Sequence, residues 1–240
     1  MKKFLILLTL LGLFACTPSG HESFQYYNLY GFVDVVGPTT LSLEFPAVTL
    51  NVTEDRTDSG WARAQTVFFQ YDILNRTAND RYDIRVIAYY PVERKLVRSK
   101  SEVSAEEYGS DAVAFHEDWG FNREKRTFNV SCYITTLKDS ETQHTITLVA
   151  DEARSNADTL YLELHHQGFG ETYENEAYEP KDFIVENRFL RFNLGSVFPV
   201  NASKDLVLTL EWDWFPTENG ALVRQREHFQ ASADLSQLSE

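Results

Sequence analysis

The side chains best placed for catalysis are two carboxylates two residues apart, Glu211 and Asp213. In a strand they would share one face at roughly 7 Å, a separation that a glycosidase acid and base could use. The chain holds 36 acidic residues, however, so such pairs arise by chance on wet strand faces. Nothing nearby indicates a raised carboxyl pKa, and we therefore expect no catalytic residues and no enzyme.

Histidines and carboxylates also invite a metal site. His165 and His166 are consecutive and would point to opposite faces of a strand, so one ion cannot bind both. Glu163 and His165 would share a face without a visible third ligand, and we expect that face to be exposed and polar. The run His116–Asp118 lacks any recognised ligand spacing. We predict no metal and no other cofactor.

Nucleophilic catalysis finds no support either. The chain has no GxSxG motif. Cys132 is in phase with the apolar residues Phe128, Val130 and Ile134, so we expect a buried small hydrophobe.

The N-terminus has the anatomy of an export signal. Lys2 and Lys3 precede an apolar run of about 11 residues, too short to cross a membrane as a helix. Residues 13–16, Leu-Phe-Ala-Cys, resemble a bacterial lipobox, in which the cysteine is lipidated. The sequence predicts a signal peptide over residues 1–15, lipidation at Cys16 and a tether over residues 16–24. The alternative is an ordinary secretory signal cleaved near Ala15.

Charge limits the possible partners. Loss of residues 1–15 removes two of 22 basic and none of 36 acidic residues, so the net charge moves from −14 to −16. We therefore expect no nucleic-acid partner and no basic membrane-binding face. The composition, 43% hydrophobic, is sufficient for a sizeable core.

The first half of the chain, up to residue 97, is predicted to form strands. Residues 61–92 alternate apolar and polar side chains twice around the polar segment 75–81, which predicts an antiparallel hairpin with a longish loop. Three further strands are expected at residues 26–35, 39–45 and 47–52. Five strands without a credible helix favour a small barrel over residues 25–97.

The second half alternates in the same way. The pattern predicts an all-β chain in which a charged linker, residues 98–125, leads to an antiparallel β-sandwich over residues 126–230 and a tail over residues 231–240.

Together with the lipobox, several short segments in order resemble the NigD-like lipoproteins of Bacteroides and relatives. These segments are Tyr71–Leu74, Tyr82–Arg85, Asp111–Phe115, His144–Val149 and Leu160–His166. The resemblance implies an N-terminal OB-type barrel, a C-terminal β-sandwich and no catalytic residues. It also implies a possible immunity or accessory role.

Aromatic residues supply the candidate binding surfaces. The barrel half carries more tyrosines than a two-sided core needs, including Tyr30, Tyr89 and Tyr90. The long connection 167–186 interleaves Phe169, Tyr173 and Tyr178 with carboxylates, which suits a basic or neutral partner or a Ca²⁺ ion. A solvated, mobile insertion is the alternative.

These features favour a non-enzymatic, lipid-anchored envelope protein that binds a glycan or another envelope protein. The alternatives are an immunity or stress-protective lipoprotein acting through a protein partner, and a carbohydrate-active enzyme. A single acidic residue follows Cys16 within residues 17–23, which favours a periplasm-facing anchor over the cell surface.

Overall fold

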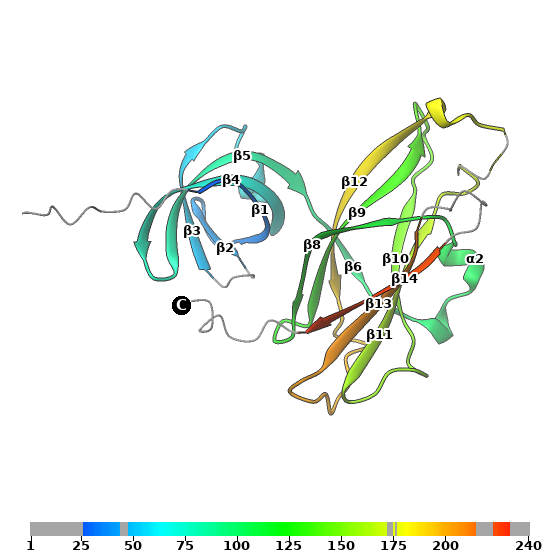
Figure 1. Cartoon of the computed structure of the whole chain (residues 1–240). Helices are drawn as coiled ribbons and strands as arrows, with labels where there is room; N and C mark the ends of the chain where they lie inside the picture. The colour runs from blue at the N-terminus through cyan, green and yellow to red at the C-terminus, as the bar shows by residue number, and fades with distance from the viewer. Residues whose placement is uncertain (1–25, 44–47, 172–174, 176, 215–222, 231–240) are drawn as a thin grey trace, which may run out of the picture.

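The computed structural model describes residues 26–43, 48–171, 175, 177–214 and 223–230 (Figure 1). Within these ranges the chain is built almost entirely of strands, which form one barrel and one two-layered sandwich. The predicted all-β class, with a barrel followed by a sandwich, is confirmed. The expected signal peptide (1–15), tether (16–24) and tail (231–240) lie outside the described residues.

The barrel has five strands in the closed order β1-β2-β3-β5-β4. They are β1 (Tyr26–Val35), β2 (Thr40–Leu43), β3 (Val48–Asp55), β4 (Thr66–Ala78) and β5 (Arg81–Pro91). Pairing of β1 with β4 closes the ring, and β3 runs parallel to β5. Inward residues such as Leu41, Leu50, Phe69 and Ile84 are buried because alternate side chains along each strand face the barrel interior.

The central hairpin differs from the prediction at both ends. A short 3₁₀ helix (Gly60–Arg63) precedes β4 and buries Trp61, whose Nε1 donates to Oδ2 of Asp55 at 2.8 Å. Strands β4 and β5 continue to Ala78 and from Arg81, so the expected long loop is a two-residue turn. Backbone pairing extends through polar residues there, since a strand needs an apolar face only where that face is buried.

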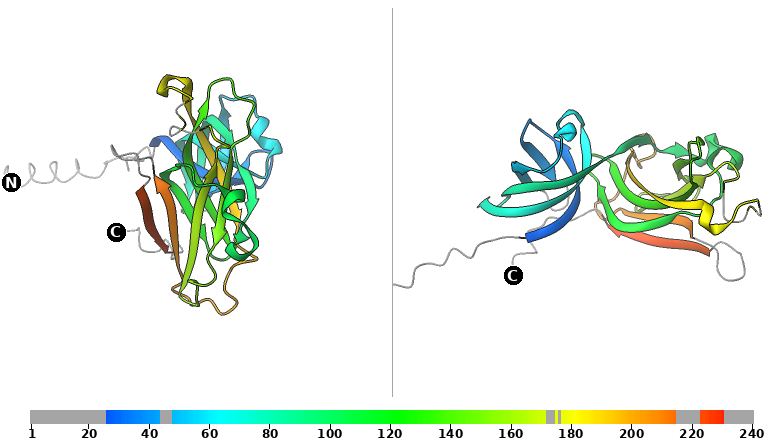
Figure 2. Two further views of the ribbon diagram at one scale, coloured as in Figure 1. Left: turned by 90° about the vertical axis from the view of Figure 1, so that its right-hand side faces the viewer. Right: turned by 90° about the horizontal axis from the view of Figure 1, so that it is seen from above.

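The sandwich has two sheets. One has the order β6-β12-β9-β8, and the other has the order β14-β13-β11-β10-β7. In Figure 2, right, the orange and red strands β13 and β14 lie in one layer, and the green and yellow strands β9 and β12 lie in the other. The bounds are β6 (Glu93–Leu96), β7 (Arg98–Ser99), β8 (Ala114–Asn122), β9 (Thr127–Leu137), β10 (Thr145–Ala150), β11 (Thr159–Gln167), β12 (Phe183–Asn193), β13 (Val207–Trp214) and β14 (Val223–Gln230).

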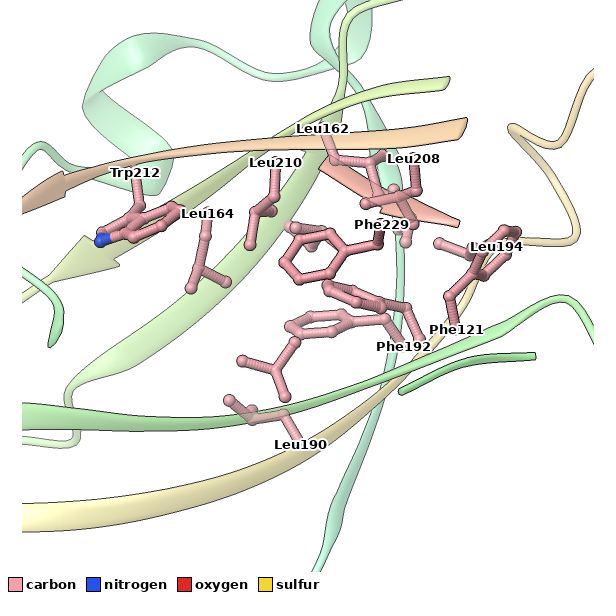
Figure 3. Close-up of a cluster of buried hydrophobic side chains, with 14 of the residues drawn as sticks. Phe121, Leu162, Leu164, Leu190, Phe192, Leu194, Leu208, Leu210, Trp212 and Phe229 are labelled. Atoms are coloured by element: carbon pink, nitrogen blue, oxygen red, sulfur yellow. The ribbon is translucent and has the colours of Figure 1, made fainter. Parts of the chain in front are cut away.

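Most strand pairs in the sandwich are antiparallel, as expected, but β11 with β13, β12 with β6 and β10 with β7 are parallel. The inner faces carry the alternating apolar residues seen in the sequence. Figure 3 shows Leu162 and Leu210 from one sheet opposite Leu190 and Phe192 from the other. Cys132 is fully buried, as predicted, and burial raises the pKa of its thiol to about 12.

The predicted linker over residues 98–125 is wrong. Those residues contribute β7, a short helix α2 (Ala105–Tyr108) and β8 to the sandwich, and β6 begins two residues after β5 ends. Val97, Val113 and Phe121 lie in the sandwich core. Charged residues are frequent in this segment, and β7 and β8 are edge strands, so the sequence shows too few alternating apolar residues to reveal them.

No helix in the described ranges has the length and apolarity needed to cross a membrane.

Candidate functional site

The barrel and the sandwich meet through three buried aromatic rings. Phe189 of β12 projects from the outer face of its sheet and stacks on Phe68 of β4, with ring centroids 4.2 Å apart and planes at 19°. Phe32 of β1 meets Phe189 edge-on at 6.3 Å. These residues are each less than 9% exposed, so apolar burial fixes the contact between the two domains.

Beside these rings, ion pairs and hydrogen bonds also join the two domains. Arg191 of β12 contacts Asp34 of the barrel, donates from Nη1 to Oγ1 of Thr66 at 3.0 Å, and donates from Nε to Oδ1 of Asn129 at 2.8 Å. Lys125 also reaches Asp34, at 2.9 Å. Burial acts to raise the pKa of Asp34, but hydrogen bonds and charge from Lys125 and Arg191 outweigh it and lower that pKa.

A cleft opens next to this joint, with a volume of about 440 Å³. Its lining combines residues of barrel strands β1, β4 and β5 with residues of sandwich strands β9 and β12. These residues are Tyr30, Phe68, Tyr90, Ser131, Tyr133, Asn187 and Phe189. A volume of this size falls in the range of small-molecule sites, which often lie between domains.

The barrel side of the cleft is a row of rings. Tyr30 stacks against Phe68 at 6.2 Å, and Phe68 lies 6.4 Å from Tyr90. Tyr90 in turn lies 5.2 Å from Phe189. Tyr30 is 49% exposed and Tyr90 is 39% exposed, so both present ring surface to solvent at the mouth of the cleft.

The sandwich side supplies polar groups. Asn187 pairs with Tyr133 across strands β12 and β9, and Ser131 pairs with Phe189, so all four project from the same outer face. Ser131 is only 3% exposed, and it forms part of the cleft lining. None of the described residues that line the cleft is an Asp, Glu, Lys, Arg or His. The described lining combines aromatic rings with hydroxyl and amide groups, an arrangement that suits ligand binding.

The structure separates the aromatic residues proposed from the sequence. Tyr90 lines the cleft, whereas Tyr89 lies on the opposite face of β5, against the barrel core, and donates its hydroxyl to Asp58 at 3.0 Å. Phe169 and Tyr178 lie in the connection between β11 and β12, at the end of the sandwich farther from the barrel (Figure 1). Tyr173 lies outside the described residues.

Sequence reasoning missed five residues of the cleft lining: Phe68 of the barrel and Ser131, Tyr133, Asn187 and Phe189 of the sandwich. The four sandwich residues occupy strand positions whose alternation marks a solvent-facing side. Two aromatic rings on such a face, Tyr133 and Phe189, were the available signal, since an aromatic residue on a wet face often marks a contact surface.

The connection between β11 and β12 is anchored at its start. Glu171 accepts hydrogen bonds from the hydroxyls of Ser140 and Thr142, both at 2.6 Å, and faces Nε2 of His144 at 3.1 Å. Burial acts to raise the pKa of Glu171, but these hydrogen bonds outweigh it and lower that pKa. Phe169 stays 61% exposed and has a positive φ of 55°. Tyr178 packs edge-on against Phe183 at 6.0 Å.

His144 also belongs to a buried histidine pair. Nδ1 of His166 lies 2.9 Å from the carbonyl oxygen of Ala112 and must donate to it. Nε2 of a neutral His166 then accepts from Nδ1 of His144, 2.9 Å away. Nε2 of His144 faces Oε2 of Glu171 at 3.1 Å, and the two residues form an ion pair when His144 is protonated. Burial lowers the pKa of His166.

The face with Glu163 and His165 is buried, and the prediction that it is exposed is wrong. The two residues are 5% and 6% exposed, and their side chains lie 3.2 Å apart. Lys100 covers Glu163, donating at 2.7 Å, because the segment 98–108 folds over this sheet as β7 and α2. The hydrogen bond from His165, followed by that from Lys100, lowers the pKa of Glu163 to about 2.

Glu211 and Asp213 do share an outer face, but arginines neutralise both. Arg154 donates to both oxygens of Glu211, at 2.7 and 2.9 Å, and Arg226 donates to one of them at 2.7 Å. Arg224 pairs with Asp213 at 3.0 Å. Hydrogen bonds from Arg154 and then Arg226 lower the pKa of Glu211 to about 2, the opposite of what a general acid requires.

Among the described residues, no group of three or more His, Cys, Asp or Glu side chains is arranged to hold a metal ion.

A five-stranded barrel with OB-type strand order, joined to a β-sandwich, defines a class of two-domain all-β proteins. Residues 95–180 match the family described as the NigD-like C-terminal beta sandwich domain. The chain therefore carries a NigD-like sandwich domain, and the resemblance drawn from the sequence is confirmed. No curated protein matches the chain.

Solved structures share the fold over nearly the whole chain. A NigD-like immunity protein from Bacteroides caccae aligns with a TM-score of 0.59 at 15% identity, covering 86% of this chain and 100% of that one. A candidate lipoprotein from Bacteroides fragilis aligns with a TM-score of 0.58 at 13% identity, covering 87% and 98%. A protein of unknown function from Bacteroides vulgatus aligns with a TM-score of 0.56 at 15% identity, covering 89% and 93%. None of the three is named as an enzyme.

Proposed function

We propose that this protein is a non-enzymatic binding protein of the bacterial cell envelope, anchored by lipid at Cys16, whose ligand occupies the cleft between the barrel and the sandwich. The observation that carries the proposal is the cleft itself. Exposed rings of Tyr30 and Tyr90 face polar side chains of β9 and β12 across it. The stacked contact of Phe68 with Phe189 holds the two walls in place.

The envelope location rests on different evidence. The export signal and the lipobox support a lipid anchor, and a neighbour of the same fold is named as a candidate lipoprotein. The single acidic residue within residues 17–23 favours an anchor that faces the periplasm. Anchoring near a membrane suits a binding protein, because it restricts the search for an envelope ligand to a thin layer.

A second candidate function is an immunity or stress-protective lipoprotein that acts through a protein partner. The name of the Bacteroides caccae neighbour favours it. In that case the contact surface is the connection between β11 and β12, where Phe169 is exposed and several carboxylates create a negative field. Tyr173 and Tyr178 would belong to the same surface. The cleft and this loop lie at different ends of the sandwich, so separate variants can test them.

A carbohydrate-active enzyme is the least supported alternative. Its best carboxylate pair, Glu211 and Asp213, is held by three arginines, and the pKa of Glu211 is lowered.

The test compares two double variants of the mature chain for capture of components from an envelope extract of the source bacterium. Tyr30→Ala with Tyr90→Ala removes the exposed rings of the cleft, and Phe169→Ala with Tyr178→Ala removes those of the loop. We expect the cleft variant to weaken capture about tenfold or more, since central aromatic contacts are often worth over 1 kcal/mol each. The loop variant should match wild type.

Loss of capture in the loop variant alone would favour the protein-partner function. Equal capture by both variants and wild type would refute a role for either surface. Circular dichroism melting checks that each variant is folded.

A further inference from the structure

The composition of the cleft restricts the charge of its occupant. The chain is strongly acidic, with a formal net charge of −14, and 24% of its residues are charged. Among the described residues, however, no charged side chain lines the cleft. A charged ligand group placed against this part of the lining would lose water without gaining a counter-charge, which costs several kcal/mol. The described lining therefore favours an uncharged ligand group.

The rings of the barrel side favour a ligand with flat apolar faces. Tyr30, Phe68 and Tyr90 form a row in which neighbouring centroids are 6.2 and 6.4 Å apart. Phe68 is 2% exposed and fixed by its stack on Phe189, while its two neighbours are open to solvent. Such rigid rings bury large areas at a low cost in conformational entropy. The C–H faces of a sugar ring or the ring of proline would fit equally well here.

The polar side chains on the sandwich side of the cleft distinguish a sugar ligand from a proline-rich one. Ser131 is nearly buried, lines the cleft and carries a hydroxyl that can both donate and accept a hydrogen bond. Asn187 adds an amide with two donors and one acceptor oxygen. A proline-rich peptide offers mainly carbonyl acceptors, which can bond the N–H groups of Asn187 but not its oxygen. A ligand rich in hydroxyl groups offers donors and acceptors together.

We propose that the occupant of the cleft is a segment of an uncharged oligosaccharide, with a sugar face on Tyr30 and Tyr90 and its hydroxyls bonded to Ser131 and Asn187. This inference rests on the proposed function, because it names the ligand class of the same cleft. A proline-rich peptide and an acidic oligosaccharide are the other outcomes of the test.

The test is a titration of the ¹⁵N-labelled mature chain, followed by NMR. The neutral probes are cellotriose, maltotriose, mannotriose and triacetylchitotriose. Trigalacturonate serves as the acidic probe and hexaproline as the peptide probe. Each is added up to about 10 mM, which detects millimolar binding. We expect at least one neutral probe to shift the amide signals around Tyr30, Ser131 and Asn187, and trigalacturonate and hexaproline to leave them unchanged.

Variants then assign the contacts. Tyr30→Ala with Tyr90→Ala should weaken binding of the neutral probe at least tenfold, and Ser131→Ala should weaken it about threefold or more. Tyr26→Ala, at an exposed tyrosine of β1 outside the cleft lining, serves as the control and should bind like wild type. Ser131→Ala is small enough to keep the fold, so it remains informative if the double variant is unstable.

Failure of this inference differs from failure of the proposed function. Shifts at the cleft with trigalacturonate or hexaproline, but with no neutral probe, would overturn the ligand class and leave the cleft as a binding site. An unperturbed cleft with every neutral probe would also overturn the ligand class. The proposed function fails only if the cleft variants in addition leave envelope capture unchanged.

Discussion

Replacing Glu211 with Gln should destabilise the sandwich in a way that depends on pH. The folded protein holds the pKa of Glu211 at about 2, against 4.5 for an ordinary Glu side chain, through hydrogen bonds from Arg154 and then Arg226. A difference of that size corresponds to roughly 3 kcal/mol of stability at neutral pH. The two arginine side chains are 36% and 55% exposed, so solvent screening reduces the expected loss to about 1–2 kcal/mol.

The direction of the pH dependence follows from the lowered pKa. Above about pH 4.5 the carboxylate is ionised in both folded and unfolded chains, and its full contribution is present. As the pH falls toward 2, the unfolded chain takes up the proton first and the contribution is lost. At pH 3 roughly less than half of the difference between wild type and Glu211→Gln should remain.

The assay is urea unfolding, followed by circular dichroism, at pH 7, 4 and 3. Asp213→Asn is the matched control, because Asp213 is more exposed and pairs only with Arg224 at short range; we expect a change within about 0.5 kcal/mol. A difference between wild type and Glu211→Gln below about 0.5 kcal/mol at pH 7, or one that is unchanged at pH 3, would refute the reasoning.

Three further predictions concern the joint, the loop anchor and the N-terminus. Arg191→Met removes the contacts of Arg191 with Asp34 and Thr66, and we expect about 2 kcal/mol lower stability and a larger radius of gyration in small-angle scattering; an unchanged radius would mean that Arg191 does not help to hold the domains together. Glu171→Leu removes the partner of His144, so amide hydrogen exchange should accelerate over residues 168–171 and stay constant in the barrel, whereas equal exchange in both proteins would mean that Glu171 does not anchor the loop. Cys16→Ser should move the protein from the detergent phase to the aqueous phase, because each buried methylene of the lipid contributes about 0.8 kcal/mol; a variant still found in the detergent phase would contradict lipidation.

The strands could be predicted because each has one buried face. Alternation in Leu160–Leu164 and Leu206–Trp212 leaves apolar residues on a single side, and those residues fill the core. For the charged stretch 98–125 this alternation was not visible, and the segment was wrongly predicted to be a linker. Its strands β7 and β8 lie at sheet edges, and the core residue Phe121 of β8 stands among polar and charged neighbours in the sequence.

The cleft could be predicted only in part. Tyr90 was identified as a binding candidate, but its neighbour Tyr89 points to the other face of β5, and sequence alone could not tell which face stays open. Phe189 and Ser131 lie on a strand face whose pattern indicates solvent exposure. Their burial depends on where the barrel docks against the sandwich, and that contact joins residues more than 100 positions apart. No local periodicity encodes such a contact.

The most direct test of the cleft as the ligand site is a map of amide chemical shifts over the whole labelled chain on addition of a neutral oligosaccharide. We predict that the shifts concentrate at Tyr30, Tyr90, Ser131 and Asn187, and that they disappear in the Tyr30→Ala and Tyr90→Ala double variant. Shifts centred on the loop around Phe169 and Tyr178, or shifts that persist unchanged in the double variant, would contradict the assignment.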